Sequence, residues 1–259
     1  NTFGGGDAGS NISGGDSNTG IGYRAFYTLV TGNDNTAFGR EALYTLNGGG
    51  KNTAMGVFAL KNQTTSAYNT AFGYAAGWEL TTGANNVFVG TKIAANIANV
   101  SASKNVCIGY EAGYTISTCT DNVFVGYHAG NANTTGSSNT SVGTDSGQAL
   151  TTAVSNTFIG MESGYACTTG YYNACVGRRT GYALTTGYNN VFMGRQAGQN
   201  TTTGAENTAF GSMALNQVTT ADHNVGIGSG AGRYITGDGN VAIGVNAADA
   251  MAVGESENI

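Results

Sequence analysis

The pentad Asn35-Thr36-Ala37-Phe38-Gly39 decides the fold, because near copies of it recur along the whole chain. It returns as Asn69-Thr70-Ala71-Phe72-Gly73 and as Asn207-Thr208-Ala209-Phe210-Gly211, and in a looser form as Asn122-Val123-Phe124-Val125-Gly126. Self-similarity at a fixed period is the mark of a repeat architecture. The chain is therefore interpreted as a repeat protein.

The repeats are counted from their asparagines, which begin fifteen units of mostly 17 residues. The unit that begins at Asn86 is two residues longer, and the unit that begins at Asn224 is one residue shorter. Since the chain opens on a repeat and ends just after Asn258, we expect residues 1–259 to be one continuous array cut from a longer one. The units begin at Asn1, Asn18, Asn35, Asn52, Asn69, Asn86, Asn105, Asn122, Asn139, Asn156, Asn173, Asn190, Asn207, Asn224 and Asn240.

Composition narrows the class of protein. Among the 259 residues there are 43 glycines and no proline, only 10% are charged, and 40% are hydrophobic at regular spacing, which does not describe disorder. The net charge is −5, and the ten basic residues are scattered apart from Arg178-Arg179. This pattern disfavours nucleic acid and anionic membranes as partners. No apolar run approaches the roughly 20 residues of a membrane helix, so we expect no membrane insertion by this segment.

Numbering each unit from its asparagine gives every column a physical meaning. Position five is glycine in all fifteen units, which predicts a positive φ or a close approach that a Cβ would block. Position four is apolar after the first unit, and position two is mostly Thr or Val, so we expect these two columns to face the interior together. Position three points the opposite way, yet it is also apolar or small, as in Ala37, Phe88, Cys107 and Phe124. A strand with two apolar faces is buried on both sides.

A single-chain coil has only one interior, so another copy is the simplest cover for the second apolar face. A cyclic homotrimer satisfies both faces with one interface. The aliphatic residues near position twelve and the recurrent Thr-Thr-Gly, as in Thr185-Thr186-Gly187, predict a second short strand and a second turn in each coil. The sequence therefore predicts an all-β fold, a parallel β-solenoid (β-roll) of about fifteen 17-residue coils assembled as a homotrimer. We expect the stacked asparagines to bond to one another and to backbone groups.

The pentads resemble two families of fibrous proteins. Asn240-Val241-Ala242-Ile243-Gly244 with Ala247, and then Ala252-Val253-Gly254, is similar to the head repeats of YadA-like trimeric autotransporter adhesins, whose fold is a trimeric left-handed parallel β-roll. Those heads usually have a shorter unit. Arrays of the form Asn-Thr-Ala-Phe-Gly…Thr-Thr-Gly resemble phage tail-fibre and related receptor-binding fibre proteins more closely, and these are also homotrimers.

The resemblance implies a structural and adhesive role. We expect a segment of a trimeric extracellular fibre, on a virion or on a bacterial cell surface, that acts as a stiff spacer. The expected partners are two further copies of the chain and a glycan or protein receptor on a host surface.

Few residues suggest chemistry. The four cysteines lack the spacing of a zinc site, and Cys107 and Cys175 lie four coils apart, so we expect free thiols, no metal and no cofactor. Position seven alternates in charge, as in Glu41, Lys92 and Glu162, which is typical of a solvated turn rather than of catalytic carboxylates. We therefore expect no enzyme and no catalytic residue.

Aromatic columns are the best candidates for contact with a ligand. They either pack over the edges of the coil and between protomers, or present amphipathic rings to a glycan or receptor. Position six holds Tyr23, Tyr74, Tyr110 and Tyr127. Position ten holds Tyr27, Tyr44, Trp78, Tyr114, Tyr165 and Tyr182.

The sequence is also compatible with two other functions. The Thr-Thr column suggests an ice-binding solenoid, although adjacent threonines on a strand point to opposite faces and give only one outward row. A glycan depolymerase with a site between protomers is the third alternative.

Overall fold

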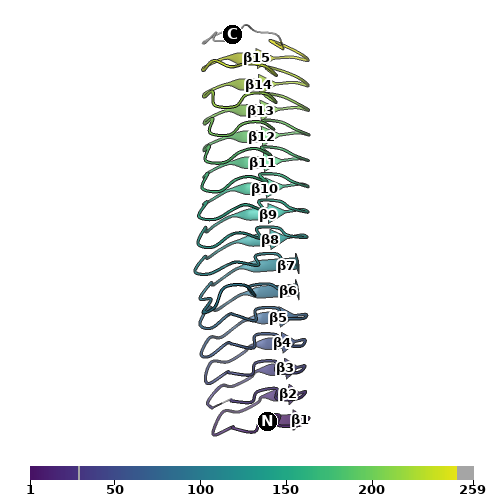
Figure 1. Ribbon diagram of the computed structural model, residues 1–259, viewed down its shortest axis with the longest axis vertical. Coiled ribbons are helices and arrows are strands. Elements are labelled where there is room, and N and C mark those ends of the chain that lie inside the picture. Colours follow the sequence, from purple (N-terminus) through teal and green to yellow (C-terminus); the bar gives the residue numbers. More distant parts are fainter. Residues whose placement is uncertain (29, 250–259) are drawn as a thin grey trace. The chain divides into compact units, whose positions relative to one another are not determined.

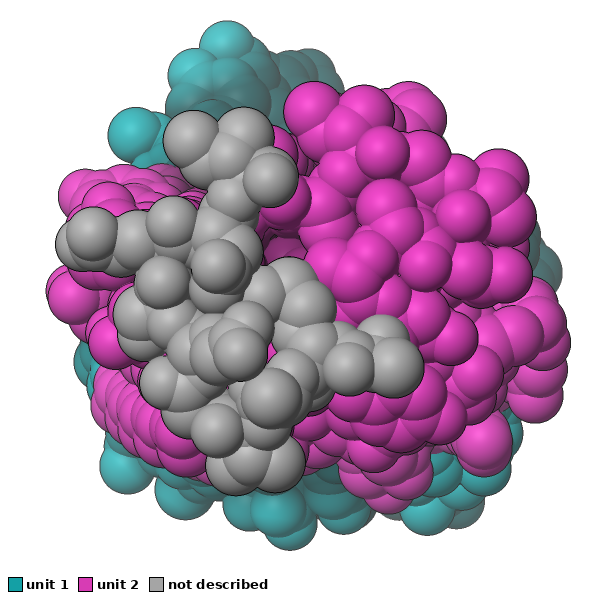
Figure 2. All heavy atoms as spheres, turned by 90° about the horizontal axis from the view of Figure 1, so that it is seen from above, with its two compact units in different colours: residues 1–135 teal, residues 136–259 magenta. Residues whose placement is uncertain are grey.

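The computed structural model describes residues 1–28 and 30–249, so the match at Ala252-Val253-Gly254 and the end of the array at Asn258 lie outside the described residues. The chain divides into two compact units, residues 1–135 and residues 136–259, which Figure 2 colours differently. Each unit is a stack of coils with one short strand in each coil (Figure 1). The described residues contain no helix.

The strands of the first unit are β1 (Thr2–Gly4), β2 (Thr19–Ile21), β3 (Thr36–Phe38), β4 (Thr53–Met55), β5 (Thr70–Phe72), β6 (Val87–Thr91), β7 (Val106–Tyr110) and β8 (Val123–Val125). Those of the second unit are β9 (Thr140–Val142), β10 (Thr157–Ile159), β11 (Ala174–Val176), β12 (Val191–Met193), β13 (Thr208–Phe210), β14 (Val225–Ile227) and β15 (Val241–Ile243). All fifteen begin directly after a repeat asparagine, so the strands follow the period of the sequence.

Within each unit, every strand pairs in parallel with the next strand of the sequence. Ala37 lies opposite Ala54 and Phe192 lies opposite Ala209, a register of one 17-residue coil. The irregular coils keep the same columns aligned, with Val87 opposite Val106 and Val225 opposite Val241. The extra or missing residues are therefore absorbed outside the strands. An all-β parallel solenoid is confirmed in both units.

The second strand predicted for each coil is wrong. In the described residues only isolated bridges form there, such as Val154 with Tyr171. The threonines do bond from coil to coil, since the N–H of Thr168 donates to the carbonyl of Thr185 at 3.0 Å. However, positions seven, nine and seventeen adopt left-handed φ values, for example +57° at Glu162 and +49° at Leu215. The chain therefore turns too often to stay extended.

The predicted direction of the strand faces is also wrong. Position three points into the coil, where Ala37, Phe88 and Phe192 are fully buried, whereas the side chains at positions two and four point outward. Strand alternation fixes only that position three opposes its neighbours. The inward side is set by packing against the rest of the coil, and position three shares that space with positions nine and twelve.

Core residues compensate for one another in volume. The coil at Asn190 combines Phe192 with Gly198, and a Cβ added to Gly198 would lie 2.5 Å from the Phe192 ring. The next coil combines Ala209 with Leu215, both fully buried. In these two coils a large residue at one of the positions accompanies a small one at the other, which keeps the interior close to native packing density.

The glycine at position five meets both conditions that were predicted for it. Gly39 has a φ of +138°, and a Cβ built there would lie 2.4 Å from the carbonyl oxygen of Gly56 in the next coil. Each coil thus turns directly against the backbone of its neighbour, and only glycine leaves room for it.

The asparagine column forms the predicted ladder. The side-chain oxygen of Asn18 accepts hydrogen bonds from both the backbone N–H and the side-chain Nδ2 of Asn35, each at 3.0 Å. The Nδ2 of Asn35 also donates to the carbonyl of Gly49 at 3.3 Å, which ties the end of the coil to its beginning. These asparagines are buried, and the ladder gives their amide groups the partners that burial requires.

Candidate functional site

The outward side of the strands carries exposed apolar side chains from coil after coil. We call it the strand face and define it by positions two and four of β1–β8 and, separately, of β9–β15. Its exposed aromatic side chains are Phe38, Phe72 and Phe210, which are 52%, 52% and 54% exposed. Other exposed members are Ile21, Ile108, Ile159, Val191, Met193, Ile227 and Ile243.

One apolar side chain is added to this row with each coil, because the strands pair in register. Met55 lies between Phe38 and Phe72 in adjacent strands, with threonines beside them at position two. Scattered apolar residues are ordinary on a protein surface, but a contiguous apolar row marks an interaction site. The structure therefore leaves one apolar face of each strand without a cover in a single chain.

The tyrosines of position six border the strand face. Tyr23, Tyr74, Tyr110 and Tyr127 are all exposed. Tyr110 and Tyr127 stack with ring centroids 5.5 Å apart. Their place next to the glycine turn agrees with the sequence, and they extend the apolar surface around one edge.

The position-ten residues are less available than the sequence suggested, since all six are half-buried. Stacked pairs form between Tyr27 and Tyr44 and between Tyr165 and Tyr182, each at 5.0 Å between centroids. Trp78 stacks on Phe58 at 5.4 Å. Among the described residues Tyr114 has no ring partner. The structure thus brings four of the six together in pairs, and their contact with a ligand stays a prediction.

Sequence reasoning missed the tyrosines at positions sixteen and seventeen. Tyr171 and Tyr188 stack at 4.9 Å, and Tyr172 and Tyr68 are 60% and 55% exposed. The signal available in the sequence was their place directly before the asparagine, at the corner that leads into the strand.

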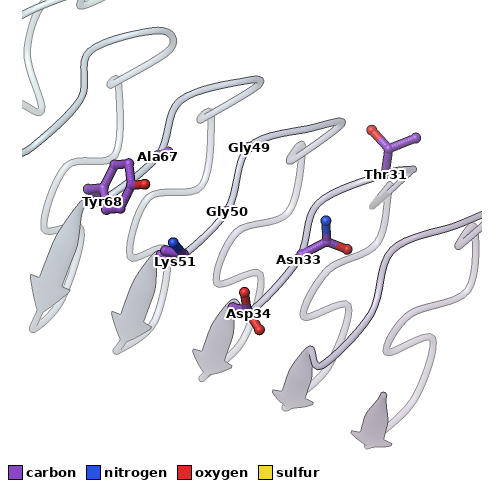
Figure 3. A pocket seen from close by; sticks show the side chains of 8 residues that line it. All are labelled: Thr31, Asn33, Asp34, Gly49, Gly50, Lys51, Ala67 and Tyr68. Atoms are coloured by element: carbon purple, nitrogen blue, oxygen red, sulfur yellow. The ribbon is translucent and has the colours of Figure 1, made fainter.

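One hollow of about 320 Å³ opens at this corner in the first unit. We call it the Tyr68 groove (Figure 3). Asp34, Lys51 and Tyr68 occupy position seventeen of three successive coils along it, and the backbone of Gly49-Gly50 lies between the neighbouring coils (Figure 3). Thr31, Asn33 and Ala67 complete its lining.

The charges of position seven pair between coils. Glu111 lies 3.5 Å from Lys92 Nζ and 3.3 Å from His128 Nε2. Arg179 donates a hydrogen bond to Glu162, which lowers the pKa of that carboxyl. In these pairs an acid meets a base of a neighbouring coil, as expected of a solvated ladder. Pairs that remain in contact with solvent contribute little to stability.

The four cysteines are free and buried, as predicted for thiols without a bridge. Burial raises the pKa of Cys119 from 9.0 to about 11 and that of Cys167 to about 12. Burial also raises the pKa of Cys107 and Cys175 well above the ordinary value. These groups therefore behave as small apolar core residues rather than as nucleophiles.

The raised thiol pKa values predict a loss of stability in alkali. Above about pH 9 the unfolded thiols release protons that the folded state retains, so the folded state binds more protons and the free energy of unfolding falls with rising pH. The expected slope is about 1.4 kcal/mol per pH unit for each thiol, up to about pH 11 for Cys119. Urea unfolding between pH 8 and pH 10.5 measures it.

Tyrosine and lysine titrate in the same range, so the control is the double variant Cys119→Ala/Cys167→Ala. The variant is expected to lose less stability than the native chain over this interval. Equal slopes for the two proteins would contradict the assignment to the buried thiols.

Comparison with known proteins gives no match to a family model, to a curated protein or to a solved structure. Within the described part of the chain, no helix is long and apolar enough to cross a membrane. Those same residues include no group of three or more His, Cys, Asp or Glu side chains that could hold a metal ion. The strand face, its aromatic borders and the Tyr68 groove are therefore the features on which a function rests.

Proposed function

We propose that this chain is a structural and adhesive segment of an extracellular homotrimeric fibre, in which three copies cover one another's strand faces. The observation that carries the proposal is the apolar row at position four, which the coil interior does not bury. In this proposal the chain carries no catalytic role. It spaces a receptor-binding region from a virion or cell surface and contributes contacts of its own to a host glycan or protein.

A second copy of the chain is the partner whose repeat spacing matches that of the apolar side chains at position four. The apolar side chain recurs once per coil, so a partner must repeat at the same spacing to bury every member. Another copy does so, and a closed cyclic arrangement leaves no strand face exposed. The strands are only three to five residues long, so the strand face is narrow. A narrow face suits three copies around a central axis better than a broad two-sided interface.

The coil construction supports the spacer role. Within each unit, successive coils are joined by parallel strand pairing, by the asparagine ladder and by hydrogen bonds between threonines. Nearest-neighbour bonding of this kind makes stability a sum over coils, so a stack can be long without a large central core.

The oligomeric state tests the proposal. We expect light scattering at micromolar concentration to give the mass of three chains for the native protein, and of one chain for Phe38→Glu/Phe72→Glu. Two buried charges in each copy would cost several kcal/mol at the interface. The circular dichroism of the variant should keep its β signal, because neither side chain lies in the coil interior.

The matched control is Thr65→Glu/Thr82→Glu, which places the same charges on exposed residues of position fourteen in the same unit. It is expected to remain trimeric. A native chain that is monomeric at micromolar concentration would refute the proposal, and so would a control that dissociates as readily as the strand-face variant.

Threonine rows favour ice binding as the second candidate. Thr152, Thr169, Thr186, Thr203 and Thr220 are all exposed at position fourteen of successive coils. Position two of the first five strands is also threonine, but the protruding phenylalanines beside it make that face uneven, which suits interdigitation better than a planar lattice. Thermal hysteresis of a dilute solution measures this activity, and its absence would dispose of the candidate.

A further inference from the structure

The Tyr68 groove lies where one coil lacks side chains at positions fifteen and sixteen. Gly49 and Gly50 occupy positions fifteen and sixteen, whereas position sixteen is Asn33 in the coil before and Ala67 in the coil after. The volume of about 320 Å³ lies at the small end of ligand sites. It suits one ring rather than a long chain.

An aromatic ring and two opposite charges border this hollow. Tyr68 is 55% exposed, and the Nζ of Lys51 lies 5.3 Å from the centroid of its ring. Asp34 occupies the same column one coil away from Lys51, yet no ion pair joins them in the described residues. The groove therefore offers an apolar surface, a carboxylate that accepts hydrogen bonds and an ammonium group that donates them.

A neighbouring amide is held in a fixed orientation. The Oδ1 of Asn33 accepts a hydrogen bond of 2.7 Å from the backbone N–H of Asp16. The NH2 of Asn33 has no partner among the described residues, so it is a further donor at the rim. Preset donors and acceptors of this kind orient a polar ligand at low entropic cost.

The combination selects a class of ligand. Lys51 would attract an anion and Asp34 would repel it, and for a cation the two effects are reversed. A ligand that carries a single net charge therefore gains little binding energy from the groove. A neutral ring with hydroxyl groups uses both, because each hydroxyl donates and accepts. Its C–H face matches the face of an exposed tyrosine. These are the properties of a pyranose.

We propose that the Tyr68 groove binds one neutral pyranose ring of a surface glycan, with the ring against Tyr68, a hydroxyl donating to Asp34 and another accepting from Lys51. This inference deepens the contact role of the proposed function and rests on it for the source of the glycan. It moves that role from the half-buried residues of position ten to the corner of the coil.

Saturation-transfer NMR of the full chain with D-glucose, D-galactose, D-mannose and N-acetyl-D-glucosamine tests the proposal, because it detects weak binding to large assemblies. At least one of the four is expected to show transfer to its ring protons. Tyr68→Ala is expected to weaken that binding by about tenfold, and Asp34→Asn by a smaller factor.

The control is Tyr172→Ala, which removes a similarly exposed tyrosine from the same column, outside the Tyr68 groove. It is expected to bind as the native chain does. Equal loss in the control would overturn the proposal, as would transfer to none of the four sugars. Binding of N-acetylneuraminic acid or adenosine in preference to them would overturn the ligand class.

Light scattering on the same samples separates this inference from the proposed function. A trimer that binds none of the sugars refutes the groove and leaves the fibre standing. A monomer that binds one of them at Tyr68 refutes the trimer and leaves the groove.

Discussion

Phe192→Ala is expected to lower the free energy of unfolding by about 3–5 kcal/mol, the usual cost of removing a buried phenylalanine. The side chain is fully buried at position three of its coil, and Gly198 beside it provides no atoms to refill the space. Urea unfolding followed by circular dichroism measures the loss. A change below about 1 kcal/mol would show that position three is not the interior column.

A transplant from the neighbouring coil provides the control. The variant Phe192→Ala/Gly198→Leu/Thr201→Val gives this coil the core set of the next one, namely Ala209, Leu215 and Val218, which are all buried. It is expected to recover most of the loss, because the new leucine fills the cavity. Leu215 already adopts the left-handed φ of +49° that position nine requires. No recovery at all would mean that the coils do not share one packing rule.

Asn190→Ala is expected to cost about 3 kcal/mol or more, since it leaves several buried polar groups without partners. The Oδ1 of Asn190 accepts from the backbone N–H of Asn207 at 3.0 Å, and its Nδ2 donates to the carbonyl of Gly204 at 2.8 Å. Both partners would be orphaned inside the coil. Urea unfolding gives the size of the loss, and hydrogen exchange should show the Asn207 amide becoming less protected.

Asn200→Ala is the matched control. Its side chain forms one exposed hydrogen bond, from Nδ2 to Gln217 Oε1, so a loss below about 1 kcal/mol is expected. Asn190→Asp should resemble Asn190→Ala rather than the native protein, because a carboxylate cannot donate to Gly204. If the ladder asparagine and the exposed asparagine cost the same, the ladder does not hold the coils together.

Much of the fold could be predicted from the sequence, because two columns permit a single residue type. The glycine of position five and the asparagine of position one report a backbone geometry that recurs in every coil. Their spacing gave the period, the parallel pairing and the coil-to-coil hydrogen bonds. A column that tolerates no other residue carries that information without any comparison to relatives.

The direction of the strand could not be predicted from the pentad, since both of its faces are apolar. The useful signal lay farther along the unit, where Phe124 accompanies Gly130 and Ala209 accompanies Leu215. Such compensation in volume shows which columns share a space. No comparable pairing accompanies Phe38, Phe72 and Phe210, because their side chains point away from the coil interior.

The corner residues were the hardest to foresee. Position seventeen holds Asp34, Lys51, Tyr68 and Tyr172 at φ between +56° and +62°, a conformation that costs a non-glycine residue about 1–2 kcal/mol. Tertiary packing imposes this conformation on varied residues, so no composition marks it. The Tyr68 groove was hidden for the same reason, because it depends on what three successive coils place side by side.

The asparagine ladder also bears on how such a protein changes length in evolution. Every coil presents the same acceptor to the coil after it and the same donors to the coil before it, so loss or duplication of a whole coil rejoins matching ends. Recombination between such repeats in a gene therefore yields longer and shorter proteins that fold by the same rule. Natural selection can then adjust reach one coil at a time, without redesign of a core.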